Sequence, residues 1–258
     1  YFGRVAPNPT YLKPASLDPA AALPAGSLEQ HAAGLEQALV VLHQVAVAGA
    51  AATNEDDLIA QVTHIIGQGL FPDNFGVMLL DEAAGGLRMH PAYQGLHPAD
   101  RDAVVPLGQG VTGRVAAGGL PRRVADTALE PNYLAIGIAM RSELCVPLRA
   151  GERTFGVVNA ESARLAAFTE ADERLLVTLA GQLATAIDRL RAEAAQRHAS
   201  LRAAESRTVL YRASQEITGS LDLERVYAAT HRAVTELMPC EAFLIALAEE
   251  DQEHIALV

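Results

Sequence analysis

The pattern of apolar and polar positions predicts two helices near the start of the chain. The first follows a Ser27–Gln30 pair that can form a capping box, and the second follows Asn54, a favourable N-cap residue. Apolar residues then recur at helical spacing: Leu28, Leu35, Leu39, Leu42 and Val45 in the first, Leu58, Ile59, Val62, Ile65 and Ile66 in the second. Residues 1–26 hold five of the 13 prolines and no such period, so we interpret them as an extended leader or linker.

Short apolar runs bounded by glycine, aspartate and proline follow these helices. They cover residues 75–81, 86–93, 142–150 and 154–162, and this texture is typical of strands. Two helices, two strands, an irregular middle, two more strands and a further helix predict an α+β fold. We expect an antiparallel sheet with helices on one face.

Residues 169–218 predict one continuous helix, because they contain no proline and only one glycine, Gly181. At 1.5 Å per residue it would extend roughly 75 Å. Its apolar positions alternate spacings of three and four, as in a coiled-coil seam interrupted at Arg197 and Thr208; the seam includes Leu176, Leu183, Ile187, Leu190 and Leu201. The helix could lie on its own domain. Because little is left to bury beyond Ala194, we favour a parallel coiled coil and therefore a homodimer.

A repeat follows the long helix. "GLFPDNFGVMLLD" at 69–81 resembles "ELMPCEAFLIALA" at 236–248, and Pro72 and Pro239 share their offset with His64 and His231. This predicts a second copy of the domain at 207–258, cut off as its second strand begins. The chain also starts without methionine, so we expect it to be a piece of a longer protein.

The composition argues against several classes of binding partner and site. The formal net charge of −11 argues against nucleic acid and anionic membrane surfaces. No apolar run approaches the ~18 residues of a membrane span, so we expect no membrane contact. Cys145 and Cys240 form no C-x-x-C pair, which suits a reducing cytoplasm and gives neither a zinc site nor a disulfide framework.

The stretch "GQGVTGRV" at 108–115 matches G-x-G-x-x-G, the glycine pattern of dinucleotide sites and kinase phosphate loops. A dinucleotide site also needs a preceding strand and a long crossover helix, whereas Pro106 interrupts the approach and Gly118, Gly119 and Pro121 leave room for a short helix only. A kinase needs a downstream lysine, and none follows Lys13. We therefore expect these glycines to shape a turn.

The surrounding sequence resembles GAF domains. The resemblance lies in "LGQGVTGRVAAGGLPRRVADTALEPNY", then "SELCVPLRAGERTFGVVNAES", then "FTEADERLLVTLAGQLATAIDRL", in family order across about 35–190. It implies a GAF domain at 27–190 with a PAS-like antiparallel sheet of five or six strands, helices on one face and a ligand pocket on the other. Such domains serve as sensory modules in bacterial histidine kinases, diguanylate cyclases and transcription regulators.

The resemblance also lets individual ligand classes be compared with this chain. Cyclic-nucleotide-binding members carry Asn-Lys followed by Phe-x-x-x-Asp-Glu; the lysine is replaced here by Ala160, while the matching positions are Asn159, Phe168, Asp172 and Glu173. Thr169 and Asp172 suit a capping box instead. Bilin attachment uses a cysteine beside a histidine, and neither cysteine has one. Sulfoxide reduction on this fold uses several cysteines, and Cys145 is interpreted as core.

The sequence contains no recognisable set of nucleophile, base and acid for catalysis. His90 is the best candidate for a haem ligand, but its position suits an ordinary histidine at the end of a strand. From GAF pocket positions we expect a ligand to be lined by Tyr93, Val111, Asp126, Tyr133, Ser142, Leu144 and Asn159. No cofactor is required by the sequence. The prediction is a non-enzymatic regulatory module, binding a small molecule or mediating dimerisation, that controls a histidine kinase or diguanylate cyclase type of output domain outside this chain. The alternative is an enzyme or a haem- or cyclic-nucleotide-binding domain on the same scaffold.

Overall fold

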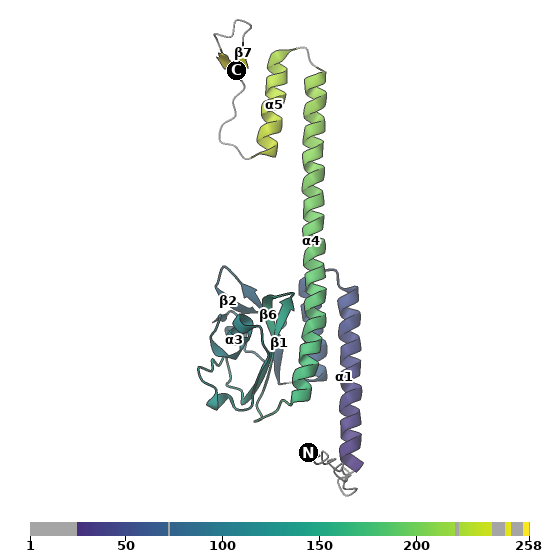
Figure 1. The fold of residues 1–258 in the computed structure, drawn as a ribbon, viewed down its shortest axis with the longest axis vertical. Helices are drawn as coiled ribbons and strands as arrows, with labels where there is room; N and C mark the ends of the chain where they lie inside the picture. The colour runs from purple at the N-terminus through teal and green to yellow at the C-terminus, as the bar shows by residue number, and fades with distance from the viewer. Residues whose placement is uncertain (1–24, 72, 220–221, 239–245, 249–254, 258) are drawn as a thin grey trace, which may run out of the picture.

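A computed structural model describes residues 25–71, 73–219, 222–238, 246–248 and 255–257 of the 258-residue chain (Figure 1). The helices are α1 (Ala25–Ala51), α2 (Glu55–Gly69), α3 (Gly110–Gly118), α4 (Glu170–Thr218) and α5 (Leu223–Leu237), with short 3-10 helices at Pro98–Asp100 and Thr127–Leu129. The strands are β1 (Asn74–Asp81), β2 (Gly86–Met89), β3 (Val104–Pro106), β4 (Arg122–Val124), β5 (Ser142–Ala150), β6 (Arg153–Ser162), β7 (Ala246–Ala248) and β8 (Ile255–Leu257).

The first six strands form one antiparallel sheet in the order β3-β2-β1-β6-β5-β4, which confirms the predicted α+β architecture. Each predicted strand is present, but the second ends at Met89 rather than at residue 93. It ends there because the chain turns: the Tyr93 N–H donates to the His90 carbonyl over 2.9 Å, and Pro91 has no N–H to donate to a neighbouring strand.

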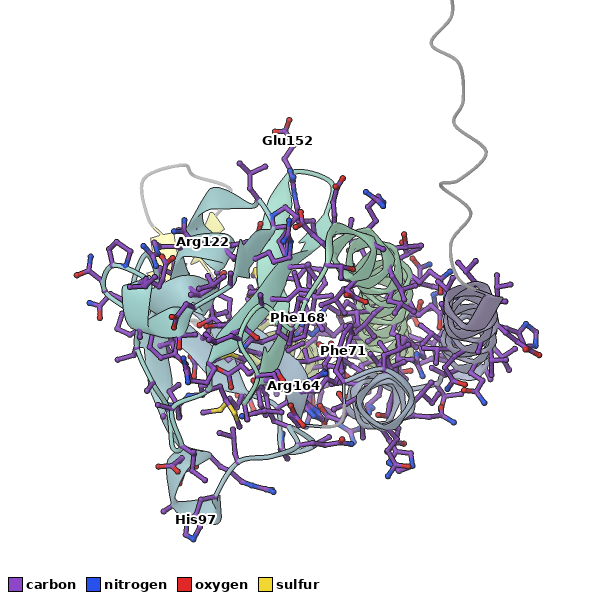
Figure 2. The ribbon with its side chains drawn as sticks, turned by 90° about the horizontal axis from the view of Figure 1, so that it is seen from below. Phe71, His97, Arg122, Glu152, Arg164 and Phe168 are labelled. Atoms are coloured by element: carbon purple, nitrogen blue, oxygen red, sulfur yellow. The ribbon has the colours of Figure 1, made fainter. Side chains whose placement is uncertain are left out.

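Two apolar clusters lie on opposite faces of this sheet. The larger is shared with α1, α2 and α4, and it includes Phe71 and Phe168, which are labelled in Figure 2. The centroid of the Phe71 ring lies 5.8 Å from that of Phe168 and 5.8 Å from that of Phe75. The smaller lies under α3 and contains Tyr93, Val111 and Cys145. Strand alternation separates the clusters, since neighbouring residues of a strand point to opposite faces.

The long helix is confirmed, and its start is fixed by the predicted capping box of Thr169 and Asp172. The interpretation of its seam is wrong for four of the five residues: Leu176, Leu183, Ile187 and Leu190 are buried in the core of their own domain. The reason is that the sheet and α2 cover this face of α4, so it has no surface left for a second copy. Leu201 lies beyond the domain and remains exposed.

The segment for which a second copy was predicted contains the end of α4 and one further helix, α5. α5 lies alongside the far end of α4 (Figure 1), and β7 pairs antiparallel with β8. Asp222 caps α5 as Asn54 caps α2, and both helices have 15 residues. Pro239, Cys240 and the predicted leader, apart from its last two residues, lie outside the described residues.

Helix α1 contains one stretch, Ala32–Ala51, that is long and apolar enough by length and composition to cross a membrane, the one such stretch in the described part of the chain. Glu36, Gln37, His43 and Gln44 interrupt it, so the sequence shows no continuous apolar run. Burial in the domain core explains only part of its apolar character, because 17% of the apolar window is buried.

The packing of α4 predicts very different costs for truncating two of its leucines. Leu183→Ala is expected to lower the free energy of unfolding by about 2–5 kcal/mol, because a fully buried side chain is lost. Leu201→Ala, at a side chain that is 61% exposed, should change it by less than about 0.5 kcal/mol. Urea unfolding monitored by circular dichroism measures both; equal costs would contradict the burial of the seam within its own domain.

Candidate functional site

The glycine stretch forms a turn, as predicted. Gly108 and Gly110 have φ of 80° and 59°, a region that favours glycine, and a Cβ on Gly113 would lie 2.3 Å from the Pro106 carbonyl oxygen. The Gly108 N–H donates to the Gly113 carbonyl over 2.9 Å and the Gln109 N–H donates to that of Pro106 over 3.1 Å. These two N–H groups are therefore already used within the turn rather than free to bind a phosphate.

The candidate site lies on the sheet face opposite α2 and α4, near the beginning of β5 and the end of β6. Glu143 pairs directly with Glu161 across these strands, and Cys145 pairs with Asn159. Leu144, which lies between Glu143 and Cys145 in β5, points to the helix side of the sheet. With Tyr93 and Tyr133 these four residues form what we call the acidic site: Tyr93, Tyr133, Glu143, Cys145, Asn159 and Glu161.

A glycine in β1 makes room for one of the two tyrosines. Gly76 pairs with Asn159, and a Cβ there would lie 2.3 Å from the Tyr93 ring. The ring therefore lies against the bare backbone, where Asn159 Nδ2 donates a 3.2 Å hydrogen bond to its Oη. Tyr133 comes from the loop that precedes β5 and packs against the same apolar cluster, where its side chain counteracts part of the rise in the pKa of Glu161.

Burial governs the protonation of the acidic site. Desolvation, and then the charge of Glu161, raise the pKa of Glu143 well above its ordinary value, and desolvation raises the pKa of Glu161 to about 7. Burial also raises the pKa of Cys145 and of Tyr93, with the two carboxylates adding to the effect. Like charges facing each other on neighbouring strands are unfavourable, so the pair retains a proton near neutral pH.

The site has more hydrogen-bond acceptors than donors. Asn159 is 3% exposed, and its Oδ1 has no hydrogen-bond partner within the described part of the chain. Leaving a buried acceptor unpaired costs free energy, about 1–3 kcal/mol. Two carboxyl groups and one amide oxygen in one place therefore suit a ligand that brings N–H donors and positive charge.

An ion-pair network fixes the loop that carries Tyr133. Glu130 accepts from Arg114 Nη2 at 2.5 Å and from Arg122 Nη2 at 2.6 Å, and only 10% of its side chain is exposed. Arg114 Nε also donates to the Gly110 carbonyl over 2.7 Å. The glycine turn, α3 and the loop are thus held together at the edge of the acidic site.

The predicted pocket residues divide into two groups. Tyr93, Tyr133 and Asn159 come together in the acidic site, and Val111 lies in the same apolar cluster. Asp126 instead caps a 3-10 helix by accepting from the Ala128 N–H.

Two pocket assignments are wrong, because Ser142 and Leu144 point to the helix side of β5. There, Ser142 Oγ donates to the Arg164 carbonyl over 2.8 Å. Glu143 and Glu161 were missed. The available signal was a glutamate within each of two otherwise apolar strands.

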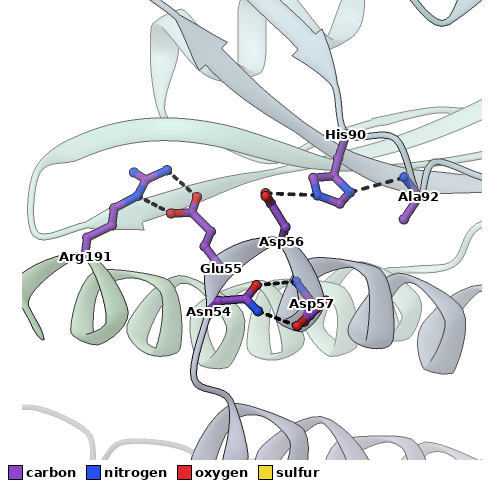
Figure 3. Close-up of polar contacts among 7 residues, drawn as sticks. All are labelled: Asn54, Glu55, Asp56, Asp57, His90, Ala92 and Arg191. Carbon is purple, nitrogen blue, oxygen red and sulfur yellow. Dashed lines mark hydrogen bonds and ion pairs between the residues drawn. The ribbon is translucent and has the colours of Figure 1, made fainter. Parts of the chain in front are cut away.

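The residues considered above for haem and cyclic-nucleotide binding make structural contacts instead. His90 Nδ1 accepts from the Ala92 N–H at 3.2 Å and Nε2 lies 3.5 Å from Asp56 Oδ1, so both ring nitrogens have partners (Figure 3). Ala160, at the lysine position of cyclic-nucleotide binders, is buried against the helices. Among the described residues no group of three or more His, Cys, Asp or Glu side chains could hold a metal ion.

The acidic site predicts that stability falls as pH rises. Glu161 binds its proton up to about pH 7 in the folded state, against an ordinary value of 4.5, so the folded chain binds more protons between these limits. The melting temperature should therefore decrease from pH 5 to pH 8, and Glu161→Gln should flatten this decrease. Calorimetric scans across that range provide the measurement; an unchanged slope in the variant would contradict a raised pKa at Glu161.

The turn predicts opposite outcomes at two glycines of α3. Gly113→Ala should destabilise the domain by about 1–3 kcal/mol, because its Cβ would overlap the Pro106 carbonyl. Gly118→Ala meets nothing within 4 Å and should leave stability unchanged or slightly raised. Thermal melts of both variants test this, and a stable Gly113→Ala domain would show that the turn tolerates a side chain.

Comparison with curated proteins finds a similar chain in Bacillus subtilis (strain 168). It is protein YtsP, which is 32% identical over 112 residues, or 43% of this chain and 66% of YtsP. The match thus spans about two thirds of that protein's length.

Comparison with solved structures agrees with the fold. Free methionine-R-sulfoxide reductase from Neisseria meningitidis, in complex with its substrate, superimposes with a TM-score of 0.55 at 29% identity, covering 59% of this chain and 89% of that one. A putative GAF sensor protein from Burkholderia vietnamiensis gives 0.55 at 21% identity, covering 61% and 97%. The family model for the GAF domain matches residues 52–188, more than half of the chain and the whole of the sheet. The chain therefore belongs to the GAF domain family.

Proposed function

We propose that the GAF domain is the regulatory module of a bacterial signal-transduction protein, and that its acidic site binds a small molecule carrying an ammonium group. The observation that carries the proposal is the pair of buried Glu143 and half-buried Glu161, next to an Asn159 Oδ1 that has no partner within the described residues. An ammonium group offers three N–H donors and a positive charge, so it would satisfy these acceptors and favour ionisation of both carboxyls.

The relatives support the same ligand class. The Neisseria meningitidis protein is named for free methionine-R-sulfoxide, an amino acid with an ammonium group, and its structure contains its substrate. A free amino acid or a similarly small amine is therefore the class that we expect here. Tyr93 and Tyr133 would flank the ligand, and the Arg114–Glu130 pair would hold the loop over it.

Binding rather than catalysis is favoured by the chemistry of Cys145. The thiol is fully buried, and burial together with both glutamates raises its pKa, so it would be protonated and a poor nucleophile. We propose that the domain does not reduce methionine sulfoxide. A reductase assay with free methionine-R-sulfoxide and dithiothreitol tests this, since turnover that disappears in Cys145→Ser would overturn it.

Helix α4 provides the route by which ligand binding would reach an output domain. It packs on the face of β5 opposite the acidic site, and Arg189 and Arg191 fix it where it leaves the domain. Arg191 forms a two-point ion pair with Glu55 at 2.8 and 2.5 Å (Figure 3) and lies 4.7 Å over the Phe155 ring. Phe155 belongs to β6, the strand that carries Asn159 and Glu161.

The parent protein is proposed to be cytoplasmic and of the histidine kinase or diguanylate cyclase type. A tandem arrangement is part of the proposal, with a second GAF domain from residue 207. The matching length and capping of α2 and α5 support it.

Titration calorimetry with the free L-amino acids, methionine-R-sulfoxide and their N-acetyl derivatives tests the ligand class. We expect at least one free amino acid to bind and its N-acetyl derivative to fail, because acetylation removes the charge. Glu161→Gln should weaken binding by roughly tenfold or more, since a charged hydrogen bond contributes about 1.5–3 kcal/mol.

The matched control is Glu152→Gln, an exposed glutamate in the β5–β6 turn, which should bind as the unchanged protein does. Circular dichroism at pH 7 verifies that each variant is folded. Equal loss in both variants, or preferential binding of the N-acetyl compounds, would contradict the assignment.

A further inference from the structure

The line of polar side chains formed by Glu143 and Glu161 continues onto β1. Asn74 of β1 pairs with Glu161, and Glu161 pairs with Glu143 of β5. Asn74 lies on the same face of the sheet as both glutamates, because its neighbour Phe75 belongs to the helix-side core and successive residues of a strand point to opposite faces. Three polar side chains therefore stand in one line across three neighbouring strands.

Asn74 is buried and its amide oxygen has no donor. The residue is 2% exposed, and its Oδ1 has no hydrogen-bond partner within the described residues. The same holds for Oδ1 of Asn159, which comes two residues before Glu161 on β6. Two unpartnered amide oxygens thus lie beside Glu161, one on its own strand and one on the strand next to it. Because a buried acceptor without a donor is unfavourable, both oxygens call for N–H groups from a ligand.

The backbone around Asn74 is held from two sides. Phe75 and Gln94 exchange backbone hydrogen bonds of 2.9 and 3.3 Å, so the loop that follows Tyr93 runs along the start of β1. Gly95 of this loop has a φ of 84°, and a Cβ there would lie 3.1 Å from the Asn74 Cβ. On the other side of the chain, Ser162 Oγ donates to Asp73 Oδ2 over 2.6 Å and ties the start of β1 to the end of β6. The acceptors are therefore preorganised, which lowers the cost of binding.

A single ammonium group is too small for all of these acceptors. Its three N–H donors would be used by Glu143, Glu161 and Asn159, which leaves Oδ1 of Asn74 without a donor. It would also balance only one of the two carboxylate charges, and an unbalanced charge away from water is costly. A second cation with N–H donors, placed between Glu161 and Asn74, would remove both deficits.

We propose that the ligand of the acidic site is a diamine or a diamino acid, and that its second ammonium group binds between Glu161 and Asn74. This inference rests on the ammonium-binding function proposed above, and it assigns to Asn74 the selection of the second amine. Neighbouring strands are about 5 Å apart, so a group between Glu143 and Glu161 and a group between Glu161 and Asn74 would also be about 5 Å apart. An extended chain of three carbon atoms separates two amines by a similar distance.

One metal ion suits the same oxygens less well. Asn74 and Glu143 are two strands, or about 10 Å, apart, whereas the oxygens that bind a calcium ion lie within about 2.6 Å of it. An elongated ligand reaches both ends of the line without drawing the strands together.

Titration calorimetry at pH 7 with matched amines tests the second ammonium group. Trimethylenediamine should bind roughly tenfold or more tightly than propylamine, and ornithine than norvaline, since a hydrogen bond to a charged group is added within each pair. The two compounds of each pair share a carbon chain and differ in one amine, so the comparison isolates the second group.

Variants of Asn74 test its part in the selection. Asn74→Ala should weaken binding of trimethylenediamine by roughly tenfold and that of propylamine by less than about twofold, because the lost oxygen contacts the second amine only. Asn74→Asp keeps an acceptor oxygen and should retain the preference for the diamine. The matched control is Gln68→Ala, at an exposed amide of α2, which should bind as the unchanged protein does. Circular dichroism verifies that each variant is folded.

The outcomes separate this inference from the function on which it rests. Equal affinity for propylamine and trimethylenediamine, or an unchanged affinity for the diamine in Asn74→Ala, would overturn the second ammonium group and leave the binding of one ammonium group standing. Failure of every amine and amino acid to bind would overturn both. Calcium or magnesium ions binding more tightly than either diamine would overturn the inference in favour of a metal site.

Discussion

The pairing of β5 with β6 constrains most other contacts of the domain. Both strands are buried on their two faces, so each residue must belong either to the helix-side core or to the side that contains the acidic site. A shift of one residue would move Glu143 into the leucine core and Leu144 into the acidic site. At Phe155, where the register with β5 shifts, the side chain turns to the helix side instead and lies under Arg191. The position of the acidic site and the anchoring of α4 both follow from this register.

The acidic site lowers the stability of the domain, and the groups that do so are those that would bind the proposed ligand. A buried and a half-buried carboxyl group on neighbouring strands are unfavourable features in an otherwise apolar sheet, as is an amide oxygen without a partner among the described residues. Their neighbours limit the cost: Asn159 donates to Tyr93, and Glu130 accepts from two arginines. Binding sites commonly accept such local instability, and the surrounding fold, fixed by the large helix-side core, tolerates it here.

The sequence was sufficient for features that depend on local chemistry. Asn54 and Thr169 cap helices where their side chains predicted, the strands at 142–150 and 154–162 have nearly the expected bounds, and the glycines of 108–113 form a turn. It was insufficient where a pattern has two possible partners. The α4 seam is regular, but a heptad does not say whether a sheet or another helix covers it. Doubly buried β5 shows no alternation, so Ser142 and Leu144 were assigned to the wrong face. The closeness of Tyr93 to Asn159 depends on the missing side chain of Gly76, 83 positions from Asn159 on another strand.

The unbroken length of α4 makes it a lever. Its first turns are clamped in the core up to Leu190, and the helix then extends about 42 Å further to Thr218 with no proline to bend it. For a rigid rod of that length, a tilt of about 5° at the clamped end displaces the far end by about 4 Å. That displacement is about three quarters of a helical turn, whereas the ends of the clamped stretch from Leu176 to Leu190, about 21 Å long, would move by about 1 Å. The displacement of a domain attached beyond Thr218 would therefore increase with the number of residues between that domain and the core.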